Sequence, residues 1–349
     1  MGRRPNARES RYVRRVRQLT LIEPRRLEWT DVPDPQRSEA RDALVRPLAV
    51  ATCDLDAPII AGRTPYQLPI AVGHECVGEV IEAADGGPPP GTLVTIPFQI
   101  SCGECDRCRR GLTGNCESVP FLSMFGFGSF GGDWGGFLSD LVRVPFADHM
   151  LSALPHGVAP DAAASVSDNV VDGWRLVAPG LEEWPGAEVL IAAGAPSVGL
   201  YGVQAAIALG AARVVYCDVD AGRLERAERL GAEPVEGYPE RLGPFPVTAM
   251  IATEHAALGL AVRSTAADGI CTCAGIMFEA ETPVPLLEMY TRVTTFRTGR
   301  VHARPLAPRV LELMAAGTLR PELVTDRVLP WEEAPEALAH NAGKLVFGA

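Results

Sequence analysis

The feature that most constrains the fold is an uncharged stretch of 24 residues, 189–212, between Glu188 and Arg213. Its length alone would suffice for a membrane-spanning helix. Glycines and a proline interrupt it, however, and so exclude one continuous span: Gly194, Pro196, Gly199, Gly202 and Gly210. The stretch instead predicts a short buried strand at Val189–Ala193, a glycine-rich turn, and a buried helix at Val198–Leu209.

Strands and helices continue to alternate after this stretch, which predicts a parallel sheet with right-handed crossovers. The expected elements there are strands at Arg213–Cys217, Val247–Ala252, Ile270–Cys273 and Thr294–Thr298 and a helix at Ala221–Leu230. Up to about residue 155 the chain is instead mainly β, with strands expected at Val16–Trp29, Ala43–Ala51, Cys76–Glu82 and Leu93–Pro97. The glycine-dense segment 126–136 is expected to be a loop, and the C-terminal part predicts a helix at Ala307–Ala316 and a strand at Lys344–Phe347.

Charge is distributed unevenly along the 349 residues. The net charge is −11, which disfavours a nucleic-acid binder because such proteins carry a basic footprint. The first 17 residues hold seven arginines and one acid, and we expect a solvated, poorly ordered arm there, with a transit peptide or a phosphate-binding tail as alternatives. No apolar core of a secretory signal follows, so we expect a cytoplasmic protein without membrane association.

Four cysteines form a compact lobe at 102–116, with the spacing C-x2-C-x2-C-x7-C: Cys102, Cys105, Cys108 and Cys116. Two-residue gaps allow a chain to wrap one ion, and four thiolates complete a tetrahedral zinc site. Because no coordination position stays open, the zinc would be structural. An iron–sulfur cluster, paired disulfides and a zinc ribbon are the alternatives.

Four further residues have the chemistry of a catalytic metal site, in which an exchangeable position remains beside the protein ligands: Cys53, His74, Glu75 and Asp168. One thiolate, one imidazole and one carboxylate would give a formally neutral zinc centre that is still a Lewis acid. Taken singly, a cysteine is most often a small buried residue, and an aspartate in this context is most often a helix cap.

The turn Gly194-Ala195-Pro196-Ser197-Val198-Gly199 lies between the expected strand and helix, and Asp218 ends the next strand. This order is typical of a dinucleotide site, with the pyrophosphate at the helix N-terminus and the acid on the adenosine ribose. Pro196 departs from the glycine pattern and removes a backbone donor. Asp218 would repel a 2′-phosphate, which favours NAD over NADP. The alternative is a plain strand–helix–strand unit without a ligand.

In this order of motifs the chain resembles the zinc-dependent alcohol dehydrogenases of the medium-chain dehydrogenase/reductase family, from about Val16 to Phe347. The resemblance implies a GroES-like catalytic β domain (1–171) interrupted by a Rossmann NAD-binding domain (172–299), with a return to the catalytic domain (300–349). It implies one catalytic zinc on Cys53, His74 and Asp168, with Glu75 as an alternating or additional ligand. It also implies that Asp56 orients His74 and that Arg223 lies near the cofactor ribose.

The chain departs from this family at several positions. Leu55 and Pro58 replace the usual first steps of a proton relay, which leaves Glu75, Asp54 or a zinc-bound water to carry the hydroxyl proton. Asp54 stands where some relatives have a phosphate-binding base, and Asp172 where a small residue or threonine often lies near the nicotinamide. Trp134, Phe127 and Trp174 are candidate pocket residues.

The function that these features predict is hydride transfer between NAD(H) and a small alcohol or carbonyl compound by a homo-oligomer, a dimer or tetramer, that does not bind nucleic acid. One alternative is a conjugate (alkene) reductase of the same family, because alkene reduction needs no carbonyl proton relay. The other is a non-catalytic nucleotide-binding member, which Pro196 and Leu55 favour.

Overall fold

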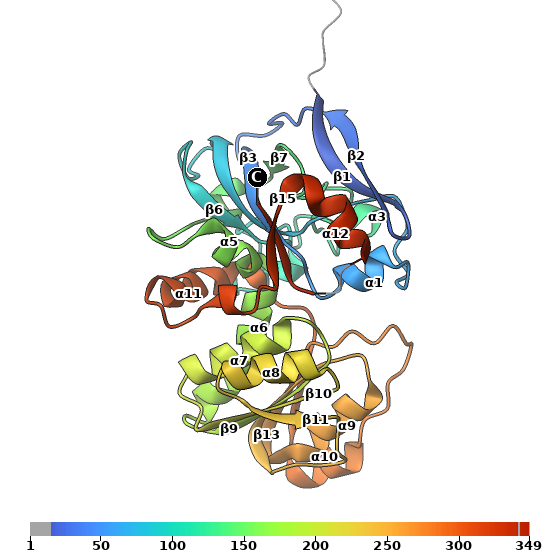
Figure 1. The fold of residues 1–349 in the computed structure, drawn as a ribbon. Helices are drawn as coiled ribbons and strands as arrows, with labels where there is room; N and C mark the ends of the chain where they lie inside the picture. The colour runs from blue at the N-terminus through green and yellow to red at the C-terminus, as the bar shows by residue number, and fades with distance from the viewer. Residues whose placement is uncertain (1–14, 341–342, 349) are drawn as a thin grey trace, which may run out of the picture.

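The computed structural model describes residues 15–340 and 343–348, in which the chain forms three sheets (Figure 1). Residues 1–14, and with them most of the expected arginine-rich arm, lie outside the described residues. Arg15 and Arg17 belong to the first strand, where Arg17 pairs with Asp140 and its guanidinium lies 5.3 Å from the ring centre of Trp29. This part of the arm is therefore structured, contrary to the expectation.

The β-rich part contains two sheets. The first is antiparallel in the order β2-β1-β4, with bounds β1 Arg15–Glu23, β2 Arg26–Pro33 and β4 Ile70–Ala71. The second runs β15-β16-β3-β5-β6-β8, with β7 also paired to β3: β3 Ala43–Ala51, β5 Glu75–Glu82, β6 Leu93–Ile96, β7 Val142–Val144, β8 Ser152–Ala153, β15 Arg327–Pro330 and β16 Leu345–Gly348. The C-terminal strands thus join the sheet formed by the first half of the chain.

The third sheet is parallel and carries the uncharged stretch. Its order is β11-β10-β9-β12-β13-β14, with bounds β9 Glu188–Ala193, β10 Arg213–Asp218, β11 Glu233–Glu236, β12 Phe245–Ile251, β13 Thr265–Cys273 and β14 Thr295–Thr298. In chain order this is 3-2-1-4-5-6, the doubly wound arrangement, whose ligand crevice lies beyond the carboxyl ends of the strands where the order reverses, here β9 and β12. Val189–Ala193 is fully buried because helices cover both faces.

In the described part of the chain, five helices belong to the parallel-sheet part, and α6 is the longest of them. Their bounds are α6 Asn169–Glu183, α7 Val198–Ala208, α8 Ala221–Arg229, α9 His255–Ser264 and α10 Leu286–Arg292. Gly173 of α6 allows close packing on α7, since a Cβ there would lie 2.6 Å from Cβ of Tyr201. The domain boundary expected between residues 171 and 172 falls inside α6, which runs from the β-rich part towards the parallel sheet (Figure 1).

The remaining helices are mostly single turns around the β-rich part. They are α1 Asp56–Ile60, α2 Asp106–Arg109, α3 Gly128–Gly131, α4 Ala147–Met150, α5 Pro160–Ala163, α11 Ala303–Ala315 and α12 Ala334–His340. Four 3₁₀ turns are Thr113–Asn115, Ala164–Ser167, Pro321–Leu323 and Trp331–Glu333. The expectation of a pure loop at 126–136 is wrong for α3, which Gly132 ends at φ +90°.

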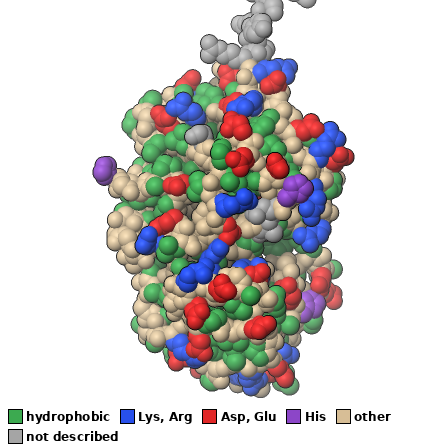
Figure 2. All heavy atoms as spheres, viewed as in Figure 1, with side chains coloured by type: hydrophobic (Ala, Val, Ile, Leu, Met, Phe, Trp, Pro, Cys, Tyr) green, Lys and Arg blue, Asp and Glu red, His purple; other side chains and the backbone are tan. Residues whose placement is uncertain are grey.

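Two expectations about the whole molecule can be compared with the structure. Among the described residues, no helix has the length and apolar character needed to cross a membrane. On the face drawn in Figure 2, basic and acidic side chains are interspersed over both parts of the molecule without an extended basic patch.

Candidate metal centre and nucleotide site

The structure brings Cys53, His74 and Asp168 together from three separate segments. Cys53 follows β3, His74 precedes β5 and Asp168 immediately precedes α6. Their ligand atoms all lie within 4.8 Å of one another. Sγ of Cys53 is 3.3 Å from Oδ2 of Asp168, and Nε2 of His74 is 3.6 Å from the same oxygen. Three donors of the types that zinc prefers therefore face one common point.

The imidazole of His74 provides a test of whether a cation fits. The ring is fully buried, and neither of its nitrogens has a hydrogen-bond partner. Nδ1 lies 3.7 Å from Oδ1 of Asp56, whose Oδ2 accepts from the N–H of Cys53 at 2.8 Å. A metal at Nε2, with Asp56 facing Nδ1, would give both nitrogens a partner, as is usual for a metal-bound histidine. The residues present therefore fit a zinc ion.

The electrostatics of the cluster also favour a cation. Burial, together with the carboxylates of Asp168 and Glu75, raises the pKa of Cys53 well above its ordinary value. Burial lowers the pKa of His74, but Asp56 and Asp168 raise it by more than burial lowers it, so that the net shift is upward. A divalent cation reverses this balance, because it stabilises the thiolate and the neutral imidazole as ligands.

Glu75 lies beside this cluster but contacts a different partner. Its Oε2 accepts from Nζ of Lys344 at 2.6 Å, and its Oε1 accepts from the N–H of Asn169 at 3.1 Å. Burial raises the pKa of Glu75, and Lys344 opposes this, with a net value of about 7. Glu75 is thus engaged with Lys344 here, and its role as an alternating ligand stays a prediction.

Sequence reasoning gave Lys344 no role, although the structure places it beside the metal cluster. Its ammonium is fully buried and donates to the carbonyl of Thr52 as well as to Glu75. The sequence feature that could have indicated a role is that Lys344 is the one lysine among 32 Lys and Arg residues.

The four cysteines at 102–116 surround a second point. Sγ of Cys102 is 4.0 Å from Sγ of Cys108, and Sγ of Cys105 is 3.9 Å from Sγ of Cys116. A zinc tetrahedron with bonds of about 2.3 Å has an edge of about 3.8 Å. All four thiols are free, so the disulfide alternative does not apply. The spacing fits a single zinc ion.

Hydrogen bonds to sulfur favour the ionised thiol at Cys102 of this lobe. Burial raises the pKa of Cys102, but the hydroxyl of Ser118 and the N–H groups of Glu104 and Cys105 lower it to about 6. N–H donation to sulfur stabilises the thiolate, which is the form that binds a metal.

The predicted nucleotide turn joins β9 to α7, and its glycines meet close neighbours. A Cβ on Gly194 would lie 2.8 Å from Cβ of Ala252, and one on Gly199 would lie 2.9 Å from Cβ of Ala193. Ser197 is the N-cap residue and Val198 the first residue of α7, while Pro196 precedes them without an N–H. The turn therefore has the tight packing of a dinucleotide site at its two glycines.

The carboxylate of Asp54 lies at the start of this helix. Its Oδ2 accepts from the N–H groups of Ser197 and Val198 at 3.1 and 2.9 Å, and its Oδ1 accepts from the hydroxyl of Ser197 at 2.6 Å. The pyrophosphate end of the predicted nucleotide site therefore already holds an anion of the chain itself.

Asp218 ends β10 as expected, fully buried. Nε and Nη2 of Arg223 donate to its two oxygens at 2.8 and 2.6 Å, and the hydroxyl of Tyr216 donates to Oδ2 at 3.1 Å. The predicted pair of ribose-binding residues thus forms one bidentate unit, in which the guanidinium offsets the charge of the acid.

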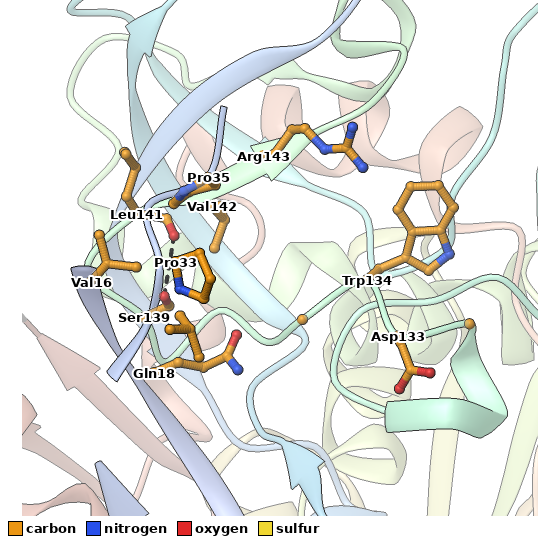
Figure 3. Close-up of a pocket in the computed structure, with 13 residues that line it drawn as sticks. Val16, Gln18, Pro33, Pro35, Asp133, Trp134, Ser139, Leu141, Val142 and Arg143 are labelled. Carbon is orange, nitrogen blue, oxygen red and sulfur yellow. Dashed lines mark hydrogen bonds between the residues drawn. The ribbon is translucent and has the colours of Figure 1, made fainter. Parts of the chain in front are cut away.

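The three candidate pocket residues lie in different places. The ring centre of Phe127 is 4.8 Å from that of His74, so this side chain contacts the metal cluster. Trp174 is buried in α6. Trp134 lines a cavity of 340 Å³ with Val16, Gln18 and Arg143 (Figure 3), and none of the three metal-ligand candidates lines that cavity.

Comparisons with known proteins identify relatives of this chain. Residues 39–155 match the family model described as the alcohol dehydrogenase GroES-like domain. A Mycobacterium tuberculosis protein named "Probable zinc-binding alcohol dehydrogenase" is 29% identical over 320 residues, which cover 88% of this chain and 80% of the relative. A medium chain reductase/dehydrogenase of Acremonium sp is 31% identical over 211 residues, which cover 58% of this chain and 70% of the relative.

A solved structure extends the likeness over the whole fold. The alcohol dehydrogenase from Thermus sp. ATN1 has a TM-score of 0.83 at 28% identity, and the match covers 95% of this chain and 99% of that chain. Together with the matched domain model, it confirms the expected fold class, a GroES-like β domain interrupted by a Rossmann domain.

Proposed function

Because the chain belongs to the zinc-dependent alcohol dehydrogenases of the medium-chain dehydrogenase/reductase family, we propose that it transfers a hydride between NAD(H) and an alcohol or carbonyl compound. The family makes it a zinc-dependent oxidoreductase. The choice of cofactor, the substrate and the residue roles below are part of the proposal.

One observation carries the proposal, namely that Asn169 connects the metal cluster to the nucleotide turn. Its Oδ1 lies 3.2 Å from Sγ of Cys53, and its Nδ2 donates to the hydroxyl of Ser197 at 2.9 Å. Hydride transfer needs the reacting carbon and the nicotinamide in contact, so the two sites must be adjacent.

The chain's own residues would prepare the reaction by position and by exclusion of water. Cys53, His74 and Asp168 would hold a zinc ion, which supplies Lewis acidity towards the oxygen of an alcohol or carbonyl group. Asp56 faces Nδ1 of His74 and holds the backbone of Cys53, which orients two of the three ligands. Phe127 packs on His74 and keeps that side of the cluster apolar. NAD, when bound, supplies the hydride acceptor.

The finer parts of the proposal rest on separate observations. Asp218 at the end of β10 supports NAD over NADP. The free thiols at all nine cysteines support a reducing, cytoplasmic location. A homo-oligomer, a dimer or tetramer, is supported by α10, which carries exposed Leu286, Leu287 and Tyr290 next to the edge strand β14. Light scattering of wild type and Leu287→Asp tests this last point, since a monomeric wild type would contradict it.

The central experiment combines metal analysis with a substrate screen followed at the NADH absorbance. Two zinc ions per chain and NAD-dependent turnover of an alcohol are the expected results. Cys53→Ala should lose one zinc and the turnover, whereas Cys76→Ala removes a buried thiol without a metal-site partner and should retain both. Full activity of Cys53→Ala would overturn the mechanism.

Conjugate alkene reduction is the second candidate, and Leu55 and Pro58 favour it because neither side chain can pass a proton. Incubation of an enal with NADH separates the two reactions, since mass and retention time distinguish the saturated aldehyde from the unsaturated alcohol.

A further inference from the structure

The position of Asp54 on α7 leads beyond the proposed function. Asp54 lies in the loop after β3 and reaches a helix that begins 144 residues later. One carboxylate oxygen accepts from two consecutive N–H groups, those of Ser197 and Val198, and the other accepts from the hydroxyl of Ser197. The acid thus caps α7 from outside, where a negative charge is stabilised by the helix dipole and by unpaired donors.

These N–H groups are the ones that the fold offers to a pyrophosphate. In a doubly wound sheet, the turn after the first strand and the first residues of the following helix hold the phosphates. Pro196 has no N–H, so Ser197 and Val198 are the first donors after Pro196 at the start of α7. Both donate to Asp54 in this structure, so a pyrophosphate and the Asp54 carboxylate compete for the same two groups.

Two basic side chains in this region already have acidic partners of their own. Lys344 is paired with Glu75, and Arg223 is paired with Asp218. A pyrophosphate at the start of α7 would therefore meet the Asp54 charge directly. The distinguishing feature of this site is that the Asp54 carboxylate occupies both N–H donors at the start of α7.

We propose that Asp54 determines nucleotide affinity in this enzyme by occupying the pyrophosphate donors of α7, so that a dinucleotide must displace the carboxylate before it binds fully. The inference rests on the proposed function, because it assumes that the cleft takes a nucleotide. It predicts that the pyrophosphate contributes little to binding in the wild-type protein and that the adenosine part contributes most.

Calorimetry with two probes tests this directly. Adenosine lacks the pyrophosphate and ADP-ribose carries it, and both are titrated into the zinc-loaded full chain. We expect wild type to bind ADP-ribose less than about threefold more tightly than adenosine. Asp54→Ala should bind ADP-ribose and NAD at least tenfold more tightly than wild type, a gain of about 1.4 kcal/mol, with adenosine unchanged.

Two further variants keep the test sharp. Asp54→Asn retains the shape but not the charge, so it should shift ADP-ribose affinity in the same direction even if the alanine variant fails to fold. Asp85→Asn removes an exposed carboxylate, 80% accessible, whose ion pair is with Arg37, and should leave both probes unchanged. Zinc content and circular dichroism of each variant show that the neighbouring Cys53 and the fold are retained.

The outcomes separate this inference from the proposed function. Wild type that binds ADP-ribose tenfold more tightly than adenosine, with no gain in either Asp54 variant, would overturn the inference and leave the proposed function standing. Absence of binding of adenosine, ADP-ribose and NAD to wild type and variants alike would overturn the proposed function, and the inference with it.

Discussion

The buried ion pair of Lys344 and Glu75 predicts a large effect of a single substitution. Nζ of Lys344 lies 2.6 Å from Oε2 of Glu75, and both side chains are completely inaccessible. Lys344→Met keeps most of the apolar stem but removes the cation. Glu75 then remains as a buried acid whose other hydrogen bond comes from the N–H of Asn169, and the carbonyl of Thr52 loses its donor. Breaking one side of such a pair costs about 3–5 kcal/mol.

The double variant Glu75→Gln with Lys344→Met provides the matched control. Removal of both charges is often close to neutral, so we expect it to recover all but about 1–2 kcal/mol. Urea unfolding followed by tryptophan fluorescence measures each variant, because Trp29 and Trp331 stack 6.2 Å apart in the same β-rich part. Zinc content is measured in parallel, since Glu75 follows His74. A loss of less than about 1 kcal/mol in the free energy of unfolding of Lys344→Met would refute the reasoning. It would also be refuted if the loss in the double variant equalled the sum of the losses in Lys344→Met and Glu75→Gln measured singly.

Three further predictions concern the four-cysteine lobe, the buried acid Asp42 and the packing of α6. Cys108→Ser should lower the zinc content by one ion per chain and expose residues 102–116 to proteolysis. The zinc ion at the candidate site of Cys53, His74 and Asp168 should be retained. Burial raises the pKa of Asp42, but hydrogen bonds from residues 38 and 39 lower it more, so its stabilisation is complete above about pH 4 and is lost as the pH falls through the folded-state value. Asp42→Asn should therefore cost about 1–3 kcal/mol at neutral pH and much less in acid, measured by urea unfolding across pH. Gly173→Ala should cost about 1–3 kcal/mol because its Cβ would overlap Tyr201. Gly259→Ala should be neutral or stabilising in thermal melts, because its Cβ meets only the far end of the long Arg263 side chain.

The fold was predictable where local pattern decides structure. Val189–Ala193 and Ala43–Ala51 are apolar runs bounded by turns, and both are buried strands in the structure. The single turn of α3 was missed because its glycines carry no helical signal, and local backbone closure at Gly132 decides it instead. Similarly, residues 169–183 mix glycine and proline with apolar residues, so the helix α6 depends on its packing against α7 and not on propensity.

The candidate site was predictable where a motif carries the chemistry. The four-cysteine spacing predicts a metal site by itself, whereas the ligand set Cys53, His74 and Asp168 is what the resemblance to the family implies. The partner of Glu75 was not predictable in this way, because Lys344 is 269 residues away and neither residue has a local pattern that names the other. The contact of Asp54 with α7 has the same character, since only the folded chain brings the two together.

Asp54, one of the departures from the family pattern, connects the candidate metal site to the predicted nucleotide turn. Cys53 belongs to the metal cluster and Asp54, the next residue, caps α7, so one peptide bond separates the two sites. Asn169 contacts both, through Cys53 Sγ and Ser197 Oγ. An anion that displaces Asp54 from α7 must therefore move a side chain attached next to a candidate metal ligand. An anion bound at the predicted nucleotide turn would therefore affect the position of Cys53 through the peptide bond between residues 53 and 54. An acid at position 54 is repelled by a bound phosphate and moves away from α7, whereas a base there would be attracted to the phosphate and stay close to α7.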